Sequence, residues 1–221
     1  MEIISLSCPN CGAPVSTRQN NCEYCQSPVI ITSFTNIADM PLPQISKYAD
    51  SYKKTLAENP DSQNLNLSIG ICYLRLKMYE KASASFEKAM EDNFDNSEPF
   101  FLAAVSLLRG KKPFVTLRPV IDKIEEYLNA AVMIEPRAVF YYFMSYIKQD
   151  YYNRKFFKTS PTSEELYATA IQYGLTETQS FHSMIVMPRP YPPEEVNMIP
   201  DKIRPERIPK RRAEKNSSQW V

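Results

Sequence analysis

The residues best suited to chemistry are four cysteines near the start of the chain. They form two C-x2-C pairs, Cys8 with Cys11 and Cys22 with Cys25, separated by ten residues. Two residues between thiolates allow a tight turn to aim both sulfurs at one ion, and two facing turns complete a tetrahedral S4 site, the geometry that zinc prefers. In a reducing compartment, paired cysteines are better explained as metal ligands than as disulfides. The spacing therefore predicts one structural Zn2+ held by all four thiolates.

The segment around these cysteines is too short to fold on apolar burial alone, so the metal must supply much of its folding free energy. Gly12 directly follows the second ligand, where a turn often needs a positive φ. Strand-like stretches, Ile3–Leu6 and Pro28–Thr32, flank the two pairs. With its C-P-x-C-G and C-x-Y-C knuckles, the segment 3–32 resembles the short zinc ribbons at the head of many bacterial multidomain proteins. Rubredoxin-like iron and a redox-active dithiol pair are the alternatives.

Few other residues could carry catalysis. The chain has four glycines and one histidine, His182. No dinucleotide-binding or P-loop motif can be written with those glycines, and no second imidazole exists for a His-based metal site. A site with four protein ligands leaves no open position on the metal. Cys72 lies apart from the pairs and is expected to be a small buried apolar residue. We therefore expect a protein that is not an enzyme.

The charge and hydropathy of the chain restrict the compartment and the kinds of partner that we expect. No stretch approaches the ~18 consecutive apolar residues of a membrane span, and the first residues lack the features of a signal peptide. A cytoplasmic setting without a membrane partner is the resulting expectation. Residues 1–36 carry a net charge of −1, from Arg18 against Glu2 and Glu23. A phosphate-binding module should carry a basic footprint, so this charge argues against nucleic acid at the ribbon.

Helical periodicity begins near residue 44 and continues to about residue 187. The stretch Gln63–Asn96 has small residues where two helices would cross and aromatic residues at regular spacing. It resembles a tetratricopeptide (TPR) repeat, on the positions Gly70, Tyr73, Tyr79, Ala82, Phe86 and Ala89. It departs from the TPR pattern at Asn66, where Trp is usual, and at Phe94, where Pro is usual. The resemblance implies a solenoid of stacked helix pairs.

The segments on either side of this repeat fit further helix pairs at the same repeat spacing. Ile45–Asn59 resembles the second helix of a preceding repeat, and about eight extra residues separate the helices of the following one. The expected elements are Pro99–Leu108, the loop Arg109–Phe114, Pro119–Ile134, then Arg137–Asp150 paired with Thr162–Tyr173, and a closing helix Thr176–Met187. Within the last pair, acidic residues at 164 and 165 suit a helix start, and Gly174 suits a helix stop.

TPR domains hold peptides or partner segments in a concave groove lined by the first helix of each pair. Carried over onto this chain, the resemblance places the partner-binding groove at Asn64, Leu67, Ile71, Leu74, Arg75, Phe101, Val105, Leu108, Arg109, Tyr141 and Lys148. An apolar floor edged with three cations would suit an extended peptide carrying carboxylates. The competing interpretation is that the apolar members of this row are buried by neighbouring helices or by the chain's own tail.

Nine aromatic residues fall within residues 140–157, interleaved with basic ones. Aromatic residues at helical spacing usually form a core or an interface. The alternative is a stacking platform for single-stranded nucleic acid. Seven prolines and a basic cluster, Lys210–Arg212, mark residues 188–221. This tail is either disordered or extended in polyproline form along a protein surface.

The sequence therefore predicts a mostly α-helical protein with four parts. These are a zinc ribbon over 1–33, a linker over 34–43, a TPR-like α-solenoid over 44–187 and a proline-rich basic tail over 188–221. The expected function is that of a non-enzymatic adaptor, which binds another protein or peptide through the groove or the aromatic third repeat. The alternative is a nucleic-acid-associated protein that uses the ribbon, residues 140–158 and the tail. Salt dependence of binding separates the two.

Overall fold

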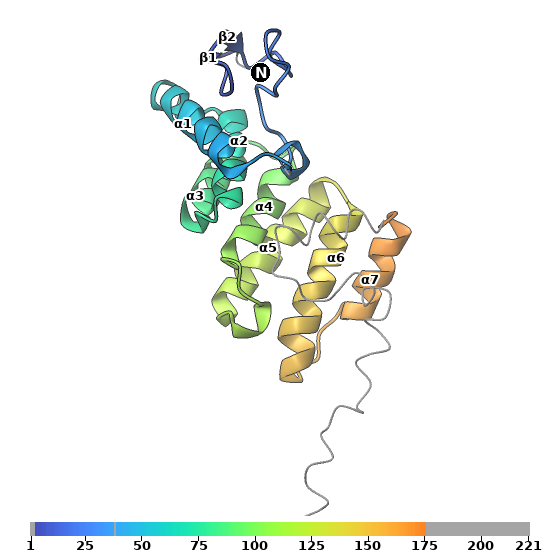
Figure 1. Cartoon of the computed structure of the whole chain (residues 1–221). Coiled ribbons are helices and arrows are strands. Elements are labelled where there is room, and N and C mark those ends of the chain that lie inside the picture. The colour runs from blue at the N-terminus through green and yellow to red at the C-terminus, as the bar shows by residue number, and fades with distance from the viewer. Residues whose placement is uncertain (1–2, 38, 176–221) are drawn as a thin grey trace, which may run out of the picture. The chain divides into compact units, whose positions relative to one another are not determined.

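The computed structural model describes residues 3–37 and 39–175. The chain is mostly helical, with a small two-stranded sheet at its N-terminal end (Figure 1). The main elements are β1 Ser5–Ser7, β2 Pro14–Ser16, α1 Leu42–Glu58, α2 Gln63–Arg75, α3 Tyr79–Met90, α4 Glu98–Leu107, α5 Arg118–Ile134, α6 Ala138–Ile147 and α7 Ser163–Gln172. Shorter helical turns are η1 Phe34–Ile37, η2 Pro113–Val115, η3 Lys148–Tyr152 and η4 Asn153–Lys155.

The helices pack in chain order, each against the next, from α1 to α7. This arrangement confirms the predicted fold class, a mostly α-helical solenoid with a small β element at its start. The predicted helix boundaries in this part agree with the structure to within a few residues. The predicted closing helix Thr176–Met187, His182 and the tail 188–221 lie outside the described residues. Among the residues that are described, no helix is both long enough and apolar enough to cross a bilayer.

Helices α2 and α3 cross closely because one position carries no side chain. A Cβ placed on Gly70 would lie 2.6 Å from the Phe86 ring, closer than any real contact allows. Phe86 is itself fully buried. The sequence prediction that Gly70 permits a close helix crossing is therefore confirmed.

Asn66, where TPR repeats usually carry Trp, has a different structural role. Its side-chain amide donates to the backbone carbonyl of Pro60 at 2.8 Å and to that of Ser62 at 3.0 Å. These two carbonyls belong to the turn between α1 and α2, and Asn66 is almost completely buried. A buried polar group needs such partners. Asn66 thus fixes the turn with hydrogen bonds.

The ends of α7 match the signals in the sequence. Thr162 accepts a hydrogen bond from the Glu165 N–H at 3.2 Å, and the Glu165 carboxylate accepts the Thr162 N–H at 2.8 Å, which forms a capping box. At the other end, Gly174 has φ +82. The N–H groups of Gly174 and Leu175 close the last turn by donating to the carbonyls of residues 171 and 170.

The extra residues between α4 and α5 pack against the end of the third helix pair. The Phe114 N–H donates to the Asp150 carboxylate at 2.9 Å, and Arg154 donates to the other oxygen of that carboxylate at 2.7 Å. The Arg154 guanidinium also lies 4.1 Å from the centroid of the Phe114 ring. Asp150 belongs to η3, a single π-helical turn that continues α6. This turn was not predicted from the sequence.

Most of the aromatic segment 140–157 forms core. Six of its nine aromatic side chains are buried, namely Phe140, Tyr142, Phe143, Tyr146, Tyr151 and Tyr152. Phe101 from α4 packs against two of them, with ring centroids 4.8 Å from Phe140 and 5.8 Å from Phe143. Buried rings cannot stack on bases, so this arrangement gives little support to the nucleic-acid alternative.

Candidate metal centre

The first cysteine pair lies in the hairpin formed by β1 and β2. These strands are antiparallel, and their register places Leu6 opposite Val15. Both side chains are buried, whereas their strand neighbours point mostly outward. The alternation follows from the period of two in a strand. The hairpin thereby fixes Cys8 at the end of one strand and Cys11 in the turn.

The two cysteine pairs have the same backbone geometry. In the first, the Gly12 N–H donates to the Cys8 carbonyl at 2.9 Å; in the second, the Gln26 N–H donates to the Cys22 carbonyl at 2.8 Å. Both residues after the second cysteine have positive φ, +78 at Gly12 and +58 at Gln26. The prediction that Gly12 needs this conformation is confirmed. Gln26 adopts this left-handed backbone conformation although it is not a glycine, the residue that the conformation favours.

The four sulfurs meet in one cluster. The Sγ atoms of Cys8 and Cys25 are 3.6 Å apart, and those of Cys11 and Cys22 are 3.7 Å apart. All four lie within 4.8 Å of one another. A tetrahedron with Zn–S bonds of about 2.3 Å has edges of ~3.8 Å, whereas a disulfide requires ~2.05 Å. The spacing therefore fits one tetrahedral metal ion and excludes a disulfide between the paired sulfurs.

The backbone and the neighbouring sulfurs set the protonation of the cluster. Hydrogen bonds from the backbone N–H and then the hydroxyl of Ser27 favour the thiolate and lower the pKa of Cys25 to about 6. The Ala13 N–H favours the thiolate of Cys11 in the same way, but desolvation and the other three sulfurs outweigh it and raise that pKa to about 12. Thiolates this close repel one another, so a divalent cation is needed to ionise all four.

Comparison with known proteins agrees with this geometry. A zinc-ribbon domain family model matches residues 5–29. The four cysteines therefore form a zinc-ribbon site for one structural Zn2+. No curated protein matches the chain. Among solved structures, the chain titled "MamA MSR-1 C2" is similar at 15% identity with a TM-score of 0.46, over 63% of this chain and 72% of that one.

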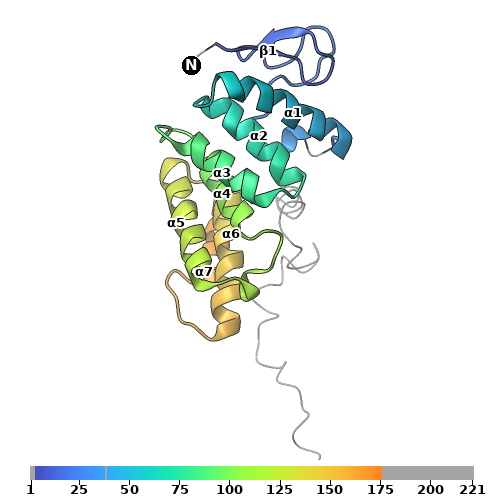
Figure 2. The same cartoon turned by 90° about the vertical axis from the view of Figure 1, so that its left-hand side faces the viewer.

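The ribbon packs on the first helices, through β1 against α1 (Figure 2) and through the segment that follows the second cysteine pair. The Tyr48 hydroxyl donates to the Pro28 carbonyl at 3.0 Å, and the Tyr52 hydroxyl donates to the Val29 carbonyl at 2.8 Å. Ser68 of α2 donates to the Ile31 carbonyl at 2.8 Å and accepts the Ile31 N–H at 3.1 Å. The strand-like stretch Pro28–Thr32 forms only an isolated antiparallel bridge, between Pro28 and Asn21, and the Val29 N–H donates to the Asn20 carbonyl at 2.9 Å. It does not continue as a strand, because side chains of α1 and α2 bond the carbonyls of residues 28 and 29 and both backbone groups of Ile31.

The segment predicted as a linker, 34–43, contributes to the core. Residues 34–37 form η1, in which Phe34 and Ile37 are buried. Helix α1 then begins at Leu42. The ribbon is thus joined to the helices by a short packed turn with its own apolar contacts.

Replacing Tyr52 with Phe is expected to loosen this junction. The hydroxyl is buried, so its loss leaves the Val29 carbonyl without a donor at a cost of about 1–3 kcal/mol in the free energy of unfolding. Urea denaturation of the zinc-loaded protein, with hydrogen exchange at residues 29–31, measures the effect. Tyr24→Phe is the matched control, because Tyr24 belongs to the ribbon but its side chain is exposed. Equal stability of both variants would contradict the assignment.

The apolar residues of the predicted groove are buried, whereas peptide binding in the groove would require them to be exposed. Leu67, Ile71, Leu74, Phe101, Val105 and Leu108 are each between 0 and 8% exposed. For Phe101 the cause is the packing of its ring against those of Phe140 and Phe143. For α2, the hydrogen bonds between Ser68 and Ile31 bring the ribbon's exit segment onto the helix face next to Leu67. An open apolar floor at these six positions is therefore corrected to a packed one.

The polar members of the predicted groove remain nearer the surface. Arg109 is exposed and pairs with Glu80 at 3.2 Å. Asn64, Arg75 and Tyr141 are half-buried, and the Tyr141 ring stacks on that of Tyr173 with centroids 5.1 Å apart. Lys148 is largely buried and forms an ion pair with Glu125 at 2.8 Å.

The residues that anchor the ribbon were not recognised as functional in the sequence. Tyr48 and Tyr52 are one helical turn apart, in the stretch Ile45–Asn59 that resembles the second helix of a preceding repeat. A pair of tyrosines at i and i+4, directly after a zinc ribbon, is the signal that could have indicated a docking face with two hydroxyl donors. Ser68 had no comparable signal.

Proposed function

We propose that the chain is a non-enzymatic adaptor that holds another protein on the surface of its helix pairs. The observation that carries the proposal is the closed S4 site, whose module is fixed to α1 and α2 by buried hydrogen bonds. A zinc ion with four protein ligands offers no open coordination position, so it stabilises structure. Within residues 3–37 and 39–175, the four cysteines are the only group of three or more potential metal ligands.

The resemblance of the helix pairs to TPR repeats supports the same role. Such repeats expose long continuous surfaces, and peptide binding is their usual activity. In this chain the partner would contact the accessible members of the predicted row, Asn64, Arg75, Arg109 and Tyr141, while the six buried apolar members support the helices beneath. The two arginines suit a partner segment that carries carboxylates.

A site-specific photo-crosslinker tests this function in cells. The crosslinking residue is placed at Asn64 or at Tyr141 of the full-length protein, both half-buried positions on the proposed surface. Met133 provides the matched control, since it is exposed on α5 outside the row. The adaptor function is supported if both test positions form an adduct with the same protein and position 133 does not. No discrete adduct, or the same adducts from all three positions, would overturn it.

A further inference from the structure

Two neighbouring segments carry an unusual local charge. Residues 111–118 and 153–158 contain six basic side chains and no acidic one, although the whole chain has a net charge of only +1. The basic side chains are Lys111, Lys112, Arg118, Arg154, Lys155 and Lys158. Arg118 forms an ion pair with Asp122 at 2.6 Å and Arg154 one with Asp150 at 2.7 Å, so the excess positive charge of the two segments comes from the four lysines.

The two segments are in direct contact. The Phe114 ring lies 4.1 Å from the Arg154 guanidinium and 5.4 Å from the Lys155 ammonium, measured to the ring centroid. At the end of the first segment, the Arg118 guanidinium lies 5.2 Å from the ring centroid of Tyr152, the residue that directly precedes the second segment. Both segments are found at the same end of α5 and α6 in Figures 1 and 2. We call the surface they form together the basic loop surface.

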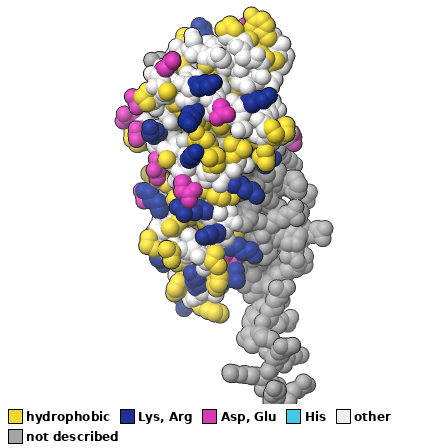
Figure 3. Space-filling view, turned by 60° about the vertical axis from the view of Figure 1, so that its left-hand side comes forward, with side chains coloured by type: hydrophobic (Ala, Val, Ile, Leu, Met, Phe, Trp, Pro, Cys, Tyr) yellow, Lys and Arg dark blue, Asp and Glu magenta, His cyan; other side chains and the backbone are white. Residues whose placement is uncertain are grey.

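The basic loop surface also exposes large apolar side chains. Phe156 is 92% exposed, Leu117 is 74% exposed, and Val115 and Phe157 are at least half exposed. Figure 3 shows hydrophobic side chains interleaved with Lys and Arg over the lower part of the face it draws. A ring that is almost fully exposed protrudes from the protein. Such a ring suits insertion into a soft apolar phase better than binding of a peptide in a groove.

The protruding residues stand on a fixed base. Phe156 has φ +61, and the Phe157 N–H donates to the Tyr152 carbonyl at 3.0 Å. Beneath them, Asp150 is nearly buried and accepts hydrogen bonds from both Phe114 and Arg154. A non-glycine residue in the left-handed region is uncommon and persists only where its surroundings hold it. Phe156 is thus held outward by the backbone of the turn.

The aromatic rings below the surface are not free for base stacking. The Lys155 ammonium lies 3.7 Å from the Tyr151 ring centroid, and Lys148 lies 4.4 Å from that of Tyr152. Both tyrosines are buried. Single-stranded nucleic acid binds through a row of accessible ring faces along a basic groove. The covered rings argue against that partner, whereas exposed apolar tips among lysines match the headgroup region of a membrane.

We propose that the basic loop surface binds the face of a membrane that contains anionic lipid. The side chains of Phe156 and Leu117 enter the boundary between headgroups and acyl chains, while the surrounding lysines contact lipid phosphates. Apolar insertion and attraction to anionic lipid together give reversible binding, and neither requires a membrane-spanning helix. The proposal goes beyond the adaptor function and does not depend on it.

Sedimentation with lipid vesicles tests the proposal. The zinc-loaded full-length protein is mixed with vesicles of phosphatidylcholine alone, or with about one-third phosphatidylglycerol. We expect binding to the anionic vesicles, weak binding to the neutral ones, and a decrease of the former as salt is added. Equal binding to both vesicle types, or binding to neither, overturns the proposal.

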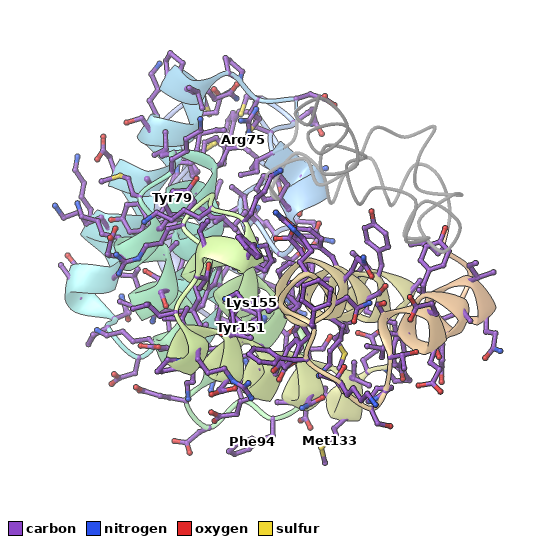
Figure 4. All side chains as sticks on the ribbon, turned by 90° about the horizontal axis from the view of Figure 1, so that it is seen from below. Arg75, Tyr79, Phe94, Met133, Tyr151 and Lys155 are labelled. Atoms are coloured by element: carbon purple, nitrogen blue, oxygen red, sulfur yellow. The ribbon has the colours of Figure 1, made fainter. Side chains whose placement is uncertain are left out.

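Matched variants assign the binding to this surface. Phe156→Ser with Phe157→Ser is expected to weaken binding to anionic vesicles about tenfold or more, through lost apolar insertion. Lys111→Ala with Lys112→Ala is expected to weaken it roughly 25-fold, at about fivefold for each lysine. The control is Phe94→Ser with Met133→Ser, two exposed apolar residues that Figure 4 shows apart from Tyr151 and Lys155. The control should bind like the wild type.

The same assay distinguishes other anionic partners. Circular dichroism first establishes that each variant folds. If the phenylalanine variant binds anionic vesicles as well as the wild type does, the proposal is wrong. Competition by an oligothymidylate or by polyglutamate provides the remaining comparison. The concentration of negative charges on the polymer is compared with that on the anionic lipid. If either polymer releases the protein from vesicles at the lower concentration of charges, the surface binds nucleic acid or an acidic protein instead.

Discussion

The Cys8→Ser variant is expected to retain well below one zinc per chain and to lose the folded structure of residues 5–31. Cys8 is buried and its sulfur is 3.6 Å from that of Cys25, so a serine removes one corner of the tetrahedron. Binding of a structural zinc to small modules of this kind supplies about 10–16 kcal/mol near neutral pH. The metal is the main internal source of stability for residues 5–26, since the two strands bury little beyond Leu6 and Val15 and the hydrogen bonds to α1 and α2 hold residues 28–31.

Metal analysis and hydrogen exchange measure these two effects. The fifth cysteine offers a matched control, because Cys72 is buried in α2 and does not belong to the sulfur cluster. Cys72→Ala should keep one zinc per chain and the protection of the ribbon amides. Full zinc content in Cys8→Ser would refute the site. Protons compete with the metal for thiolates, so the wild type should also release zinc as the pH falls.

The metal site and the helices could be predicted from the sequence because both have local signals. The cysteine spacing determines a tetrahedral site whatever surrounds it. Helices α1 to α7 follow from apolar periodicity and from prolines and glycines at their ends, as with Gly174 after α7. The close crossing at Gly70 was also predictable, since a glycine inside a helix pattern usually has a packing reason.

Features that depend on distant contacts could not be predicted. The stretch Pro28–Thr32 has strand-like composition, but its pairing stops at a single bridge with Asn21, and hydroxyl groups from α1 and α2 bond the backbone of residues 28, 29 and 31. In η3, Asp150 accepts hydrogen bonds from Phe114, which lies in the loop between α4 and α5, and from Arg154, which lies four residues further along the chain. The pair with Arg154 has the i,i+4 spacing of a helix, but no spacing along the chain reveals the contact with Phe114. These polar residues were missed because their partners lie more than ten residues away in most cases.

The predicted groove shows the limit of carrying over a family pattern. The resemblance placed Leu67, Ile71 and Phe101 on the inner face of the solenoid, but it did not include this chain's own ribbon or its aromatic α6. The exit segment of the ribbon lies on α2, and Phe140 packs on Phe101. Apolar residues on a helix face are usually core, and here the chain itself provides the covering elements.

Gly70→Val is expected to destabilise the helical part of the chain strongly, although it removes no buried side chain. Even a Cβ at this position would lie 2.6 Å from the ring of Phe86, and valine adds two further methyl groups. The ring is fully buried and has no solvent-facing position to move into. Overpacking typically costs about 1–3 kcal/mol, and we expect the upper end of that range because the ring that blocks the space is itself fully buried. The free energy of unfolding from urea denaturation is the measurement.

The control for Gly70→Val separates packing from helix propensity. Ala57→Val introduces the same β-branched side chain on the exposed face of α1. It should cost no more than about 0.5–1 kcal/mol, the difference in helix propensity between the two residues. A similar loss of stability in both variants would show that the crossing of α2 and α3 tolerates side-chain volume at residue 70.

A double variant tests whether the Phe86 ring is the obstacle. Phe86→Ala alone should cost about 3–5 kcal/mol, because it leaves a cavity between α2 and α3. In Gly70→Val with Phe86→Ala, the valine occupies part of that cavity, so the total loss should fall below the sum of the single losses by at least about 1 kcal/mol. Strict additivity would mean that the two positions do not compete for the same space. Because the helices that follow α3 stack on this pair, a shift in the crossing would also displace α4.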